Sequence, residues 1–115
     1  MSFMFHGCSS LIKLSLSSFN TQNVTDMSFM FNECYSLTKL NLSSFNTERA
    51  SNMRMMFNGC SSLSELNLSS FSMNNVDKFG KFNMFNECPN FSSFVCPNNQ
   101  VRKEAGEKVS SCICF

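Results

Sequence analysis

The feature that most constrains this chain is a repeat with a period of 26 residues. Cys8, Cys34 and Cys60 are each 26 residues apart, and Cys88 follows after 28. Such a period is typical of proteins in which every repeat forms one small unit that packs on its neighbours. Other residues share the period: Met1, Met27 and Met53; Met4, Met30, Met56 and Met84; Phe5, Phe31, Phe57 and Phe85; and Phe19, Phe45 and Phe71.

The first half of each repeat has the spacing of a short helix. Met27, Met30, Phe31 and Cys34 fall at positions i, i+3, i+4 and i+7, which lie on one face of a helix. The preceding Thr25-Asp26 pair can cap the first turn. The spacing therefore predicts a short helix with its apolar stripe facing a core.

The second half alternates instead. Leu37, Leu40 and Leu42 would point to one side of an extended chain, and Lys39 and Asn41 to the other. This period of two is typical of a strand with one buried face. We therefore expect an α/β fold, a leucine-rich-repeat solenoid with one short strand and one short helix in each of about 3.5 repeats.

The repeated pattern M-x-x-M-F-x-x-C-x-S-L-x-x-L-x-L-S-S-F resembles the BspA-like leucine-rich repeat. That family occurs in bacterial surface lipoproteins and in large families of unicellular eukaryotes, and the resemblance implies the same solenoid fold. We expect the solenoid to span residues 1–97, with repeats starting near residues 1, 27, 53 and 79. Residues 98–115 lose the period and gain charge, which predicts a flexible tail.

The outward positions of the predicted strands form the candidate partner-binding face. Stacked strands present rows of side chains about 4.8 Å apart, which suits contact with a protein partner. The alternative is a sheet face that is merely solvated. The rows comprise Lys13, Lys39 and Glu65; Ser15, Asn41 and Asn67; and Ile12, Thr38 and Ser64.

The composition argues against several other functions. Nine Lys and Arg against eight Asp and Glu give a net charge of +1, too little for a nucleic-acid-binding surface. The single histidine, His6, has Asn32, Asn58 and Asn86 as equivalents, which predicts a variable exposed position rather than a catalytic base. The repeated cysteines lack a C-x-x-C pair, so we expect core thiols rather than metal ligands or disulfides. No catalytic residue, cofactor site or metal site is predicted, and the chain is not expected to be an enzyme.

The last four residues, Cys112-Ile113-Cys114-Phe115, fit the C-a-a-X prenylation motif, and Phe at the last position favours geranylgeranylation. The chain opens without the features of a secretory signal peptide. We therefore expect a cytoplasmic protein held at the inner face of the plasma membrane by a prenyl group on Cys112. One such chain gives reversible binding, to which the weakly charged tail adds little.

Two other interpretations stay open. The chain could be a fragment of an extracellular surface adhesin, in which case the N-x-S/T sites at Asn41 and Asn67 would be glycosylated. It could also be a truncated, non-functional repeat copy, because the first repeat has no polar cap before Met1. The same uncapped end predicts end-to-end stacking on another repeat array.

Overall fold

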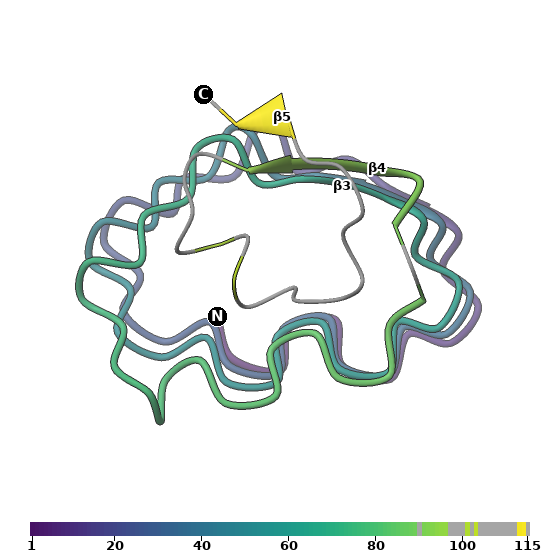
Figure 1. Cartoon of the computed structure of the whole chain (residues 1–115), viewed down its shortest axis with the longest axis horizontal. Helices are drawn as coiled ribbons and strands as arrows, with labels where there is room; N and C mark the ends of the chain where they lie inside the picture. The colour runs from purple at the N-terminus through teal and green to yellow at the C-terminus, as the bar shows by residue number, and fades with distance from the viewer. Residues whose placement is uncertain (90, 97–100, 102, 104–112, 115) are drawn as a thin grey trace.

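Each repeat contributes one short strand to a single parallel sheet (Figure 1). The computed structural model describes residues 1–89, 91–96, 101, 103, 113 and 114. The sheet has the order β1-β2-β3-β4-β5. Its strands are β1 (Lys13–Leu14), β2 (Lys39–Asn41), β3 (Glu65–Asn67), β4 (Ser93–Cys96) and β5 (Ile113–Cys114).

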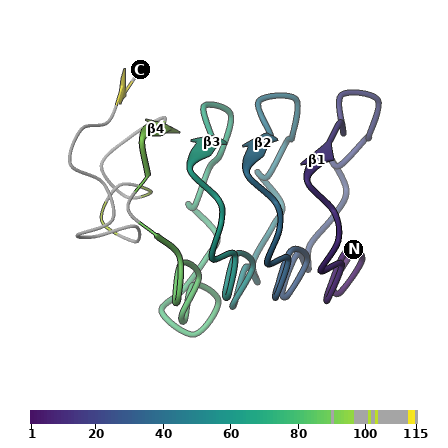
Figure 2. The ribbon, with the colours of Figure 1, turned by 90° about the vertical axis from the view of Figure 1, so that its right-hand side faces the viewer.

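Residues 1–96 form four successive coils that lie on one another in register (Figure 2). Lys13 pairs with Lys39, Lys39 with Glu65, and Glu65 with Ser93. The first four strands form the sheet side of the coils. The opposite side, formed by residues 1–8, 27–34, 53–60 and 81–88, is called the turn side below. The coils therefore follow the period of the sequence.

The turn side corrects the predicted fold class. The described part of residues 1–96 contains no helix, so the α/β strand-plus-helix solenoid is wrong. The eight-residue stripe is instead a run of tight turns. Phe29 and Glu33 take positive φ angles of 57° and 61°, which a right-handed helix excludes. The principal extents of the molecule, 29 × 28 × 26 Å, describe a compact body rather than an elongated one.

Hydrogen bonds between coils explain why turns replace the helix. The N–H groups of Met27, Phe29, Phe31 and Glu33 donate to carbonyls of the third coil at 2.7–2.9 Å. The residues between them close turns within the coil, as in the Asn32 N–H to Phe29 carbonyl bond of 3.1 Å. A helix that begins after Asp26 would need the N–H groups of Phe31 and Glu33 for its own ladder. Stacking on a neighbour therefore satisfies the backbone without a helix.

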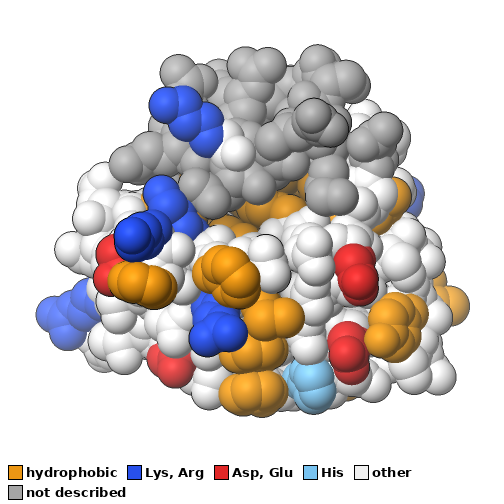
Figure 3. Space-filling model, turned by 60° about the horizontal axis from the view of Figure 1, so that its bottom comes forward, with side chains coloured by type: hydrophobic (Ala, Val, Ile, Leu, Met, Phe, Trp, Pro, Cys, Tyr) orange, Lys and Arg blue, Asp and Glu red, His pale blue; other side chains and the backbone are white. Residues whose placement is uncertain are grey.

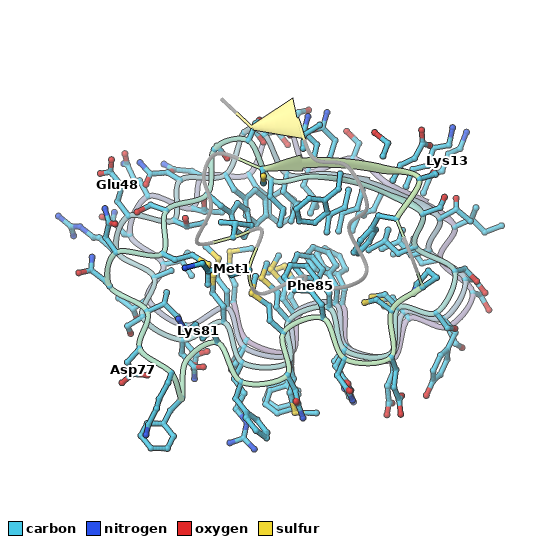
Figure 4. All side chains as sticks on the ribbon, viewed as in Figure 1. Met1, Lys13, Glu48, Asp77, Lys81 and Phe85 are labelled. Carbon is cyan, nitrogen blue, oxygen red and sulfur yellow. The ribbon has the colours of Figure 1, made fainter. Side chains whose placement is uncertain are left out.

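The predicted burial of the stripe is confirmed even though its conformation is not. Met27, Met30, Phe31 and Cys34 have no exposed surface. Phe5, Phe31, Phe57 and Phe85 stack in one column, with ring centroids 5.3–5.7 Å apart. Figure 4 shows this column in the interior, with Phe85 on the coil nearest the viewer. The sheet side adds the leucines to the same core.

An asparagine ladder crosses the turn side and corrects the expectation for the positions equivalent to His6. Asn32 and Asn58 are buried, at 4% and 8% exposure, rather than exposed. Asn58 Nδ2 donates to Asn32 Oδ1 at 2.7 Å, and Asn86 Nδ2 donates to Asn58 Oδ1 at 3.0 Å. Asn32 Nδ2 lies 3.0 Å from Nδ1 of His6, which is exposed at the first coil. Each buried amide therefore finds its partner in the same residue of the next coil.

Little of the predicted tail lies within the described residues, and Cys112 lies outside them. Val101 is fully buried in the core. Strand β5 extends the sheet, with Ile113 beside Val95 and Cys114 beside Cys96. None of the described segments forms an apolar helix of membrane-spanning length.

Candidate functional site

The outer face of the sheet carries an open groove that runs across the coils. It has a volume of about 720 Å³ and receives residues from β1 to β4. Lys13, Lys39, Glu65 and Ser93 form one row across it, in the predicted register. Ser15, Asn41, Asn67 and Val95 line the adjacent row. Figure 4 shows Lys13 pointing away from the interior on this side. The structure thus brings two of the three predicted rows together.

The third predicted row makes hydrogen bonds between neighbouring coils. Ile12 is exposed, at 57%, whereas Thr38 and Ser64 are half-buried. The Thr38 hydroxyl lies 3.5 Å from the Ile12 carbonyl, and the Ser64 hydroxyl donates to the Thr38 carbonyl at 3.3 Å. None of these three residues lines the groove. Their side chains are therefore poor candidates for partner contacts, with the exception of the exposed Ile12.

Lys39 and Glu65 form an ion pair within the row that begins at Lys13. Lys39 Nζ lies 3.0 Å from Glu65 Oε2, and both side chains remain well exposed, at 62% and 41%. Exposed pairs of this kind contribute only about 0–1 kcal/mol to stability. Among the described residues Lys13 has no such carboxylate. The row therefore offers one unpaired cation at the first coil and a neutralised pair at its centre.

Asn41 and Asn67 have a structural role that the sequence analysis missed. Asn41 Oδ1 accepts the N–H of Ser43 at 2.9 Å, and Asn67 Oδ1 accepts the N–H of Ser69 at 3.0 Å. Such Asx turns end a strand and fix the side chain. The signal was present in the sequence as Asn followed by Ser two residues later, where each strand stops. The amide nitrogen of each side chain and the second lone pair of its Oδ1 remain to face a partner.

The three buried members of the cysteine ladder, Cys34, Cys60 and Cys88, donate hydrogen bonds to backbone carbonyls. Cys8, Cys34, Cys60 and Cys88 are unbridged, and all but Cys8 are buried. Cys34 donates to the Phe5 carbonyl and Cys60 to the Phe31 carbonyl, both at 3.1 Å.

Burial also keeps the thiols of Cys34 and Cys60 unreactive. It raises the pKa of Cys34 to about 11, with a smaller contribution from Cys8. Burial also raises the pKa of Cys60 far above its ordinary value, followed by the effects of Cys88 and Cys34. Protonated, buried thiols are poor nucleophiles and poor metal ligands. The ladder is therefore part of the core, as the sequence predicts. The described residues hold no cluster of three or more His, Cys, Asp or Glu side chains arranged for a metal ion.

Cys96, at the end of β4, differs from the ladder because it is disulfide-bonded. The sequence analysis did not predict a disulfide at this position. Cys96 is fully buried. A disulfide is typical of proteins in an oxidising compartment, which bears on where the chain functions.

The repeated coils are also what a known family model recognises. The model described as "Mycoplasma protein of unknown function, DUF285" matches residues 1–102. The chain belongs to the DUF285 family. The match covers all four coils of this DUF285 chain, from Met1 to beyond the end of β4. Comparisons with curated proteins and with solved structures found no match. The family description names no activity, so the function of the DUF285 coils has to be argued from their surface.

Proposed function

We propose that this DUF285 chain is a non-enzymatic interaction module that binds a protein partner through the outer face of its sheet. The observation that carries the proposal is the groove of about 720 Å³ across β1–β4. Its rows contain Lys13, the Lys39–Glu65 pair and the amides of Asn41 and Asn67. Parallel strands hold the backbone beneath these groups at a fixed spacing, so no backbone segment has to be ordered when a partner binds.

Site-specific photo-crosslinking in cells tests this proposal. A photoreactive residue at position 15 lies in the groove, and one at position 22 lies on an exposed loop as the control. We expect a discrete crosslinked protein from position 15 only. Lys39→Glu should abolish the crosslink, because it reverses the charge at this position. The double variant Lys39→Glu, Glu65→Lys restores the ion pair and tests whether the groove tolerates the exchange of the two charges. Equal crosslinking from both positions would contradict the proposal.

The location of the module forms a separate part of the proposal, and the first candidate is a prenyl anchor on Cys112. The C-a-a-X ending supports it. Prenyl transfer requires an extended, accessible C-terminus, so Ile113 and Cys114 would have to leave their pairing with β4. The intact mass from a eukaryotic cell should then show a geranylgeranyl group, a methyl ester and loss of three residues, all absent in Cys112→Ser.

The second candidate location is outside the cell, as a surface adhesin. The disulfide at Cys96 favours it, because disulfides persist mainly in oxidising compartments. The N-x-S/T sequences at Asn41 and Asn67 add two acceptors whose amide nitrogens are not used by the Asx turns. After expression through the secretory pathway, glycan mass at these two positions with an oxidised Cys96 would support this candidate. A prenylated mass from the cytosolic form would argue against it.

A further inference from the structure

A row of large side chains projects from the turn side, on the opposite side of the coils from the groove. Phe3 and Phe82 are about half exposed, at 53% and 51%, and Phe29 is half-buried. Arg54 is exposed between Phe29 and Phe82. Figure 3 shows hydrophobic and basic side chains gathered on this face. We call Phe3, Phe29, Arg54 and Phe82 the aromatic ridge.

The members of the aromatic ridge contact one another across all four coils. The rings of Phe3 and Phe29 stack with centroids 4.6 Å apart and planes 5° apart. The Arg54 guanidinium carbon lies 6.0 Å from the centroid of Phe29 and 5.4 Å from that of Phe82. Such cation–π contacts hold the guanidinium in place between two rings while its edge stays open. The ridge is therefore a preorganised surface rather than a set of independent side chains.

The exposed rings of the ridge contribute less to stability than the buried rings of the core do. Phe3 and Phe29 have φ angles of 61° and 57°, a left-handed conformation that bulky residues rarely adopt. Such residues cost of order 1–3 kcal/mol each. Half-exposed rings also recover less hydrophobic free energy than buried ones. The same left-handed conformation recurs in every coil, so it belongs to the repeated turn: it is found at Phe3, Phe29, Met55 and Asn83 and, four residues later, at Gly7, Glu33, Gly59 and Glu87.

A hollow beside Arg54 gives the ridge a specific chemistry. The two-residue insertion of the third repeat makes a loop near Asp77 that departs from the other coils (Figure 4). It leaves a hollow of about 250 Å³ lined by Ser51, Asn52, Arg54, Asp77, Phe79 and Gly80.

The charges around this hollow are unevenly satisfied. Asp77 Oδ1 accepts the N–H groups of Phe79 and Gly80 at 3.0 and 2.8 Å, which ties its carboxylate to the loop. Among the described residues Arg54 has no carboxylate partner. Lys78 adds a second cation at the same loop, with Nζ 5.2 Å from the Phe79 ring. The open position next to the rings is therefore suited to an anion.

We infer that the aromatic ridge and this hollow bind an extended segment of a protein partner that carries a carboxylate between apolar side chains. The carboxylate pairs with the guanidinium edge of Arg54, and its apolar neighbours lie on Phe29 and Phe82. At about 4.8 Å per coil the ridge spans roughly 14 Å, which corresponds to about four extended residues. An anionic lipid surface is held by clusters of several Lys and Arg residues, and a chain with a net charge of +1 suits a single carboxylate better. This site is separate from the groove on the sheet and adds a second partner surface.

A selection from a random phage-displayed peptide library, with counter-selection against the Arg54→Gln, Phe82→Ala double variant, tests the inference. We expect peptides with Asp or Glu beside an aromatic or branched aliphatic residue. Arg54→Gln should weaken their binding roughly tenfold or more, since a paired Arg–carboxylate contact is among the stronger hydrogen bonds. Lys13→Gln removes the same charge from the other face and should leave binding unchanged. All three variants change exposed side chains and should melt like the parent chain.

Three results would overturn the inference. One is selected peptides that bind Arg54→Gln as tightly as the parent chain. Another is the absence of any peptide that survives the counter-selection. The third is sedimentation with phosphatidylcholine–phosphatidylserine vesicles that the double variant abolishes, which would assign the ridge to a lipid surface. Because the Lys13→Gln control probes the sheet face, a failure here leaves the groove proposal standing, and the reverse also holds.

Discussion

The sheet side and the turn side of each coil solve the same problem of backbone hydrogen bonding in different ways. On the sheet side, two to four residues per coil pair in register as a parallel ladder. On the turn side, alternate N–H groups bond to the next coil while the residues between them close turns within their own coil. The sheet side therefore tolerates many sequences with alternating apolar residues. The turn side demands particular residues, because it combines left-handed backbone with buried polar side chains.

The largest difference in stability between the two sides should come from substitutions in the column of stacked phenylalanine rings. Phe31 is fully buried between Phe5 and Phe57, with centroids 5.5 and 5.7 Å away. Phe31→Ala should cost about 3–5 kcal/mol, plus the loss of two ring contacts. Leu40→Ala, on the sheet side, should cost less, at about 2–3 kcal/mol. Urea unfolding followed by far-UV circular dichroism measures both.

A control at the first coil sharpens this prediction. Phe5 is only partly buried and has a stacking neighbour on one side, so Phe5→Ala should be the mildest of the three. If Phe5→Ala were as costly as Phe31→Ala, the coils could not be stacked in the order described.

The next effect should come from the asparagine ladder. Asn58→Ala removes the donor to Asn32 Oδ1, which is buried. The unpaired oxygen should cost about 1–3 kcal/mol of unfolding free energy. His6→Ala, at the exposed end of the same ladder, is the matched control and should change little, since water can replace it. Similar losses from both variants would mean that the ladder is solvated throughout.

A third effect should appear as pH rises, because the turn side buries its thiols. The pKa of Cys34 is raised from 9.0 to about 11, so folding favours the protonated thiol. Its contribution to stability is complete below about pH 9, declines as pH rises, and is lost above about pH 11. Urea midpoints at pH 8, 10 and 11 should therefore fall more steeply for the parent chain than for Cys34→Ala. Parallel curves would show that Cys34 titrates in the folded chain as it does in the unfolded one.

The two sides also differ in how far the sequence predicts them. The alternation of Leu40 and Leu42 with Lys39 and Asn41 predicts β2, because a half-buried strand has a period of two, whereas Leu37 is buried but lies before the strand. The i, i+3, i+4, i+7 stripe predicts which turn-side residues are buried but not their conformation, because tandem turns place the same residues inward. The stripe spans only eight residues, and isolated helices shorter than about 12–15 residues are marginal. Its length was therefore a signal against a helix. Gly7 and Gly59, between the stacked phenylalanine and cysteine, were the signal for a left-handed turn.

The candidate sites on the two sides also differ in how far the sequence predicts them. The rows of Lys39 and Asn41 could be predicted because strand register follows from the repeat. The Asx turns of Asn41 and Asn67 required knowledge of where each strand stops. The aromatic ridge could not be predicted, since Phe29, Arg54 and Phe82 come from different repeat positions and meet only when the coils stack.

The smallest effect is the most diagnostic, because its sign distinguishes turns from a helix. Gly59 and Gly7 have φ angles of 77° and 70°. Alanine at either position should destabilise the chain by about 1 kcal/mol, because a side chain rarely adopts this conformation. In a helix the same change would stabilise by about 1 kcal/mol. Gly59→Ala should cost slightly more, because the new Cβ would lie 3.4 Å from Glu33 Cα, whereas nothing lies within 4 Å at Gly7. Thermal unfolding of the two variants measures both the sign and the difference. A gain in stability at both positions would mean that the turn side is helical after all.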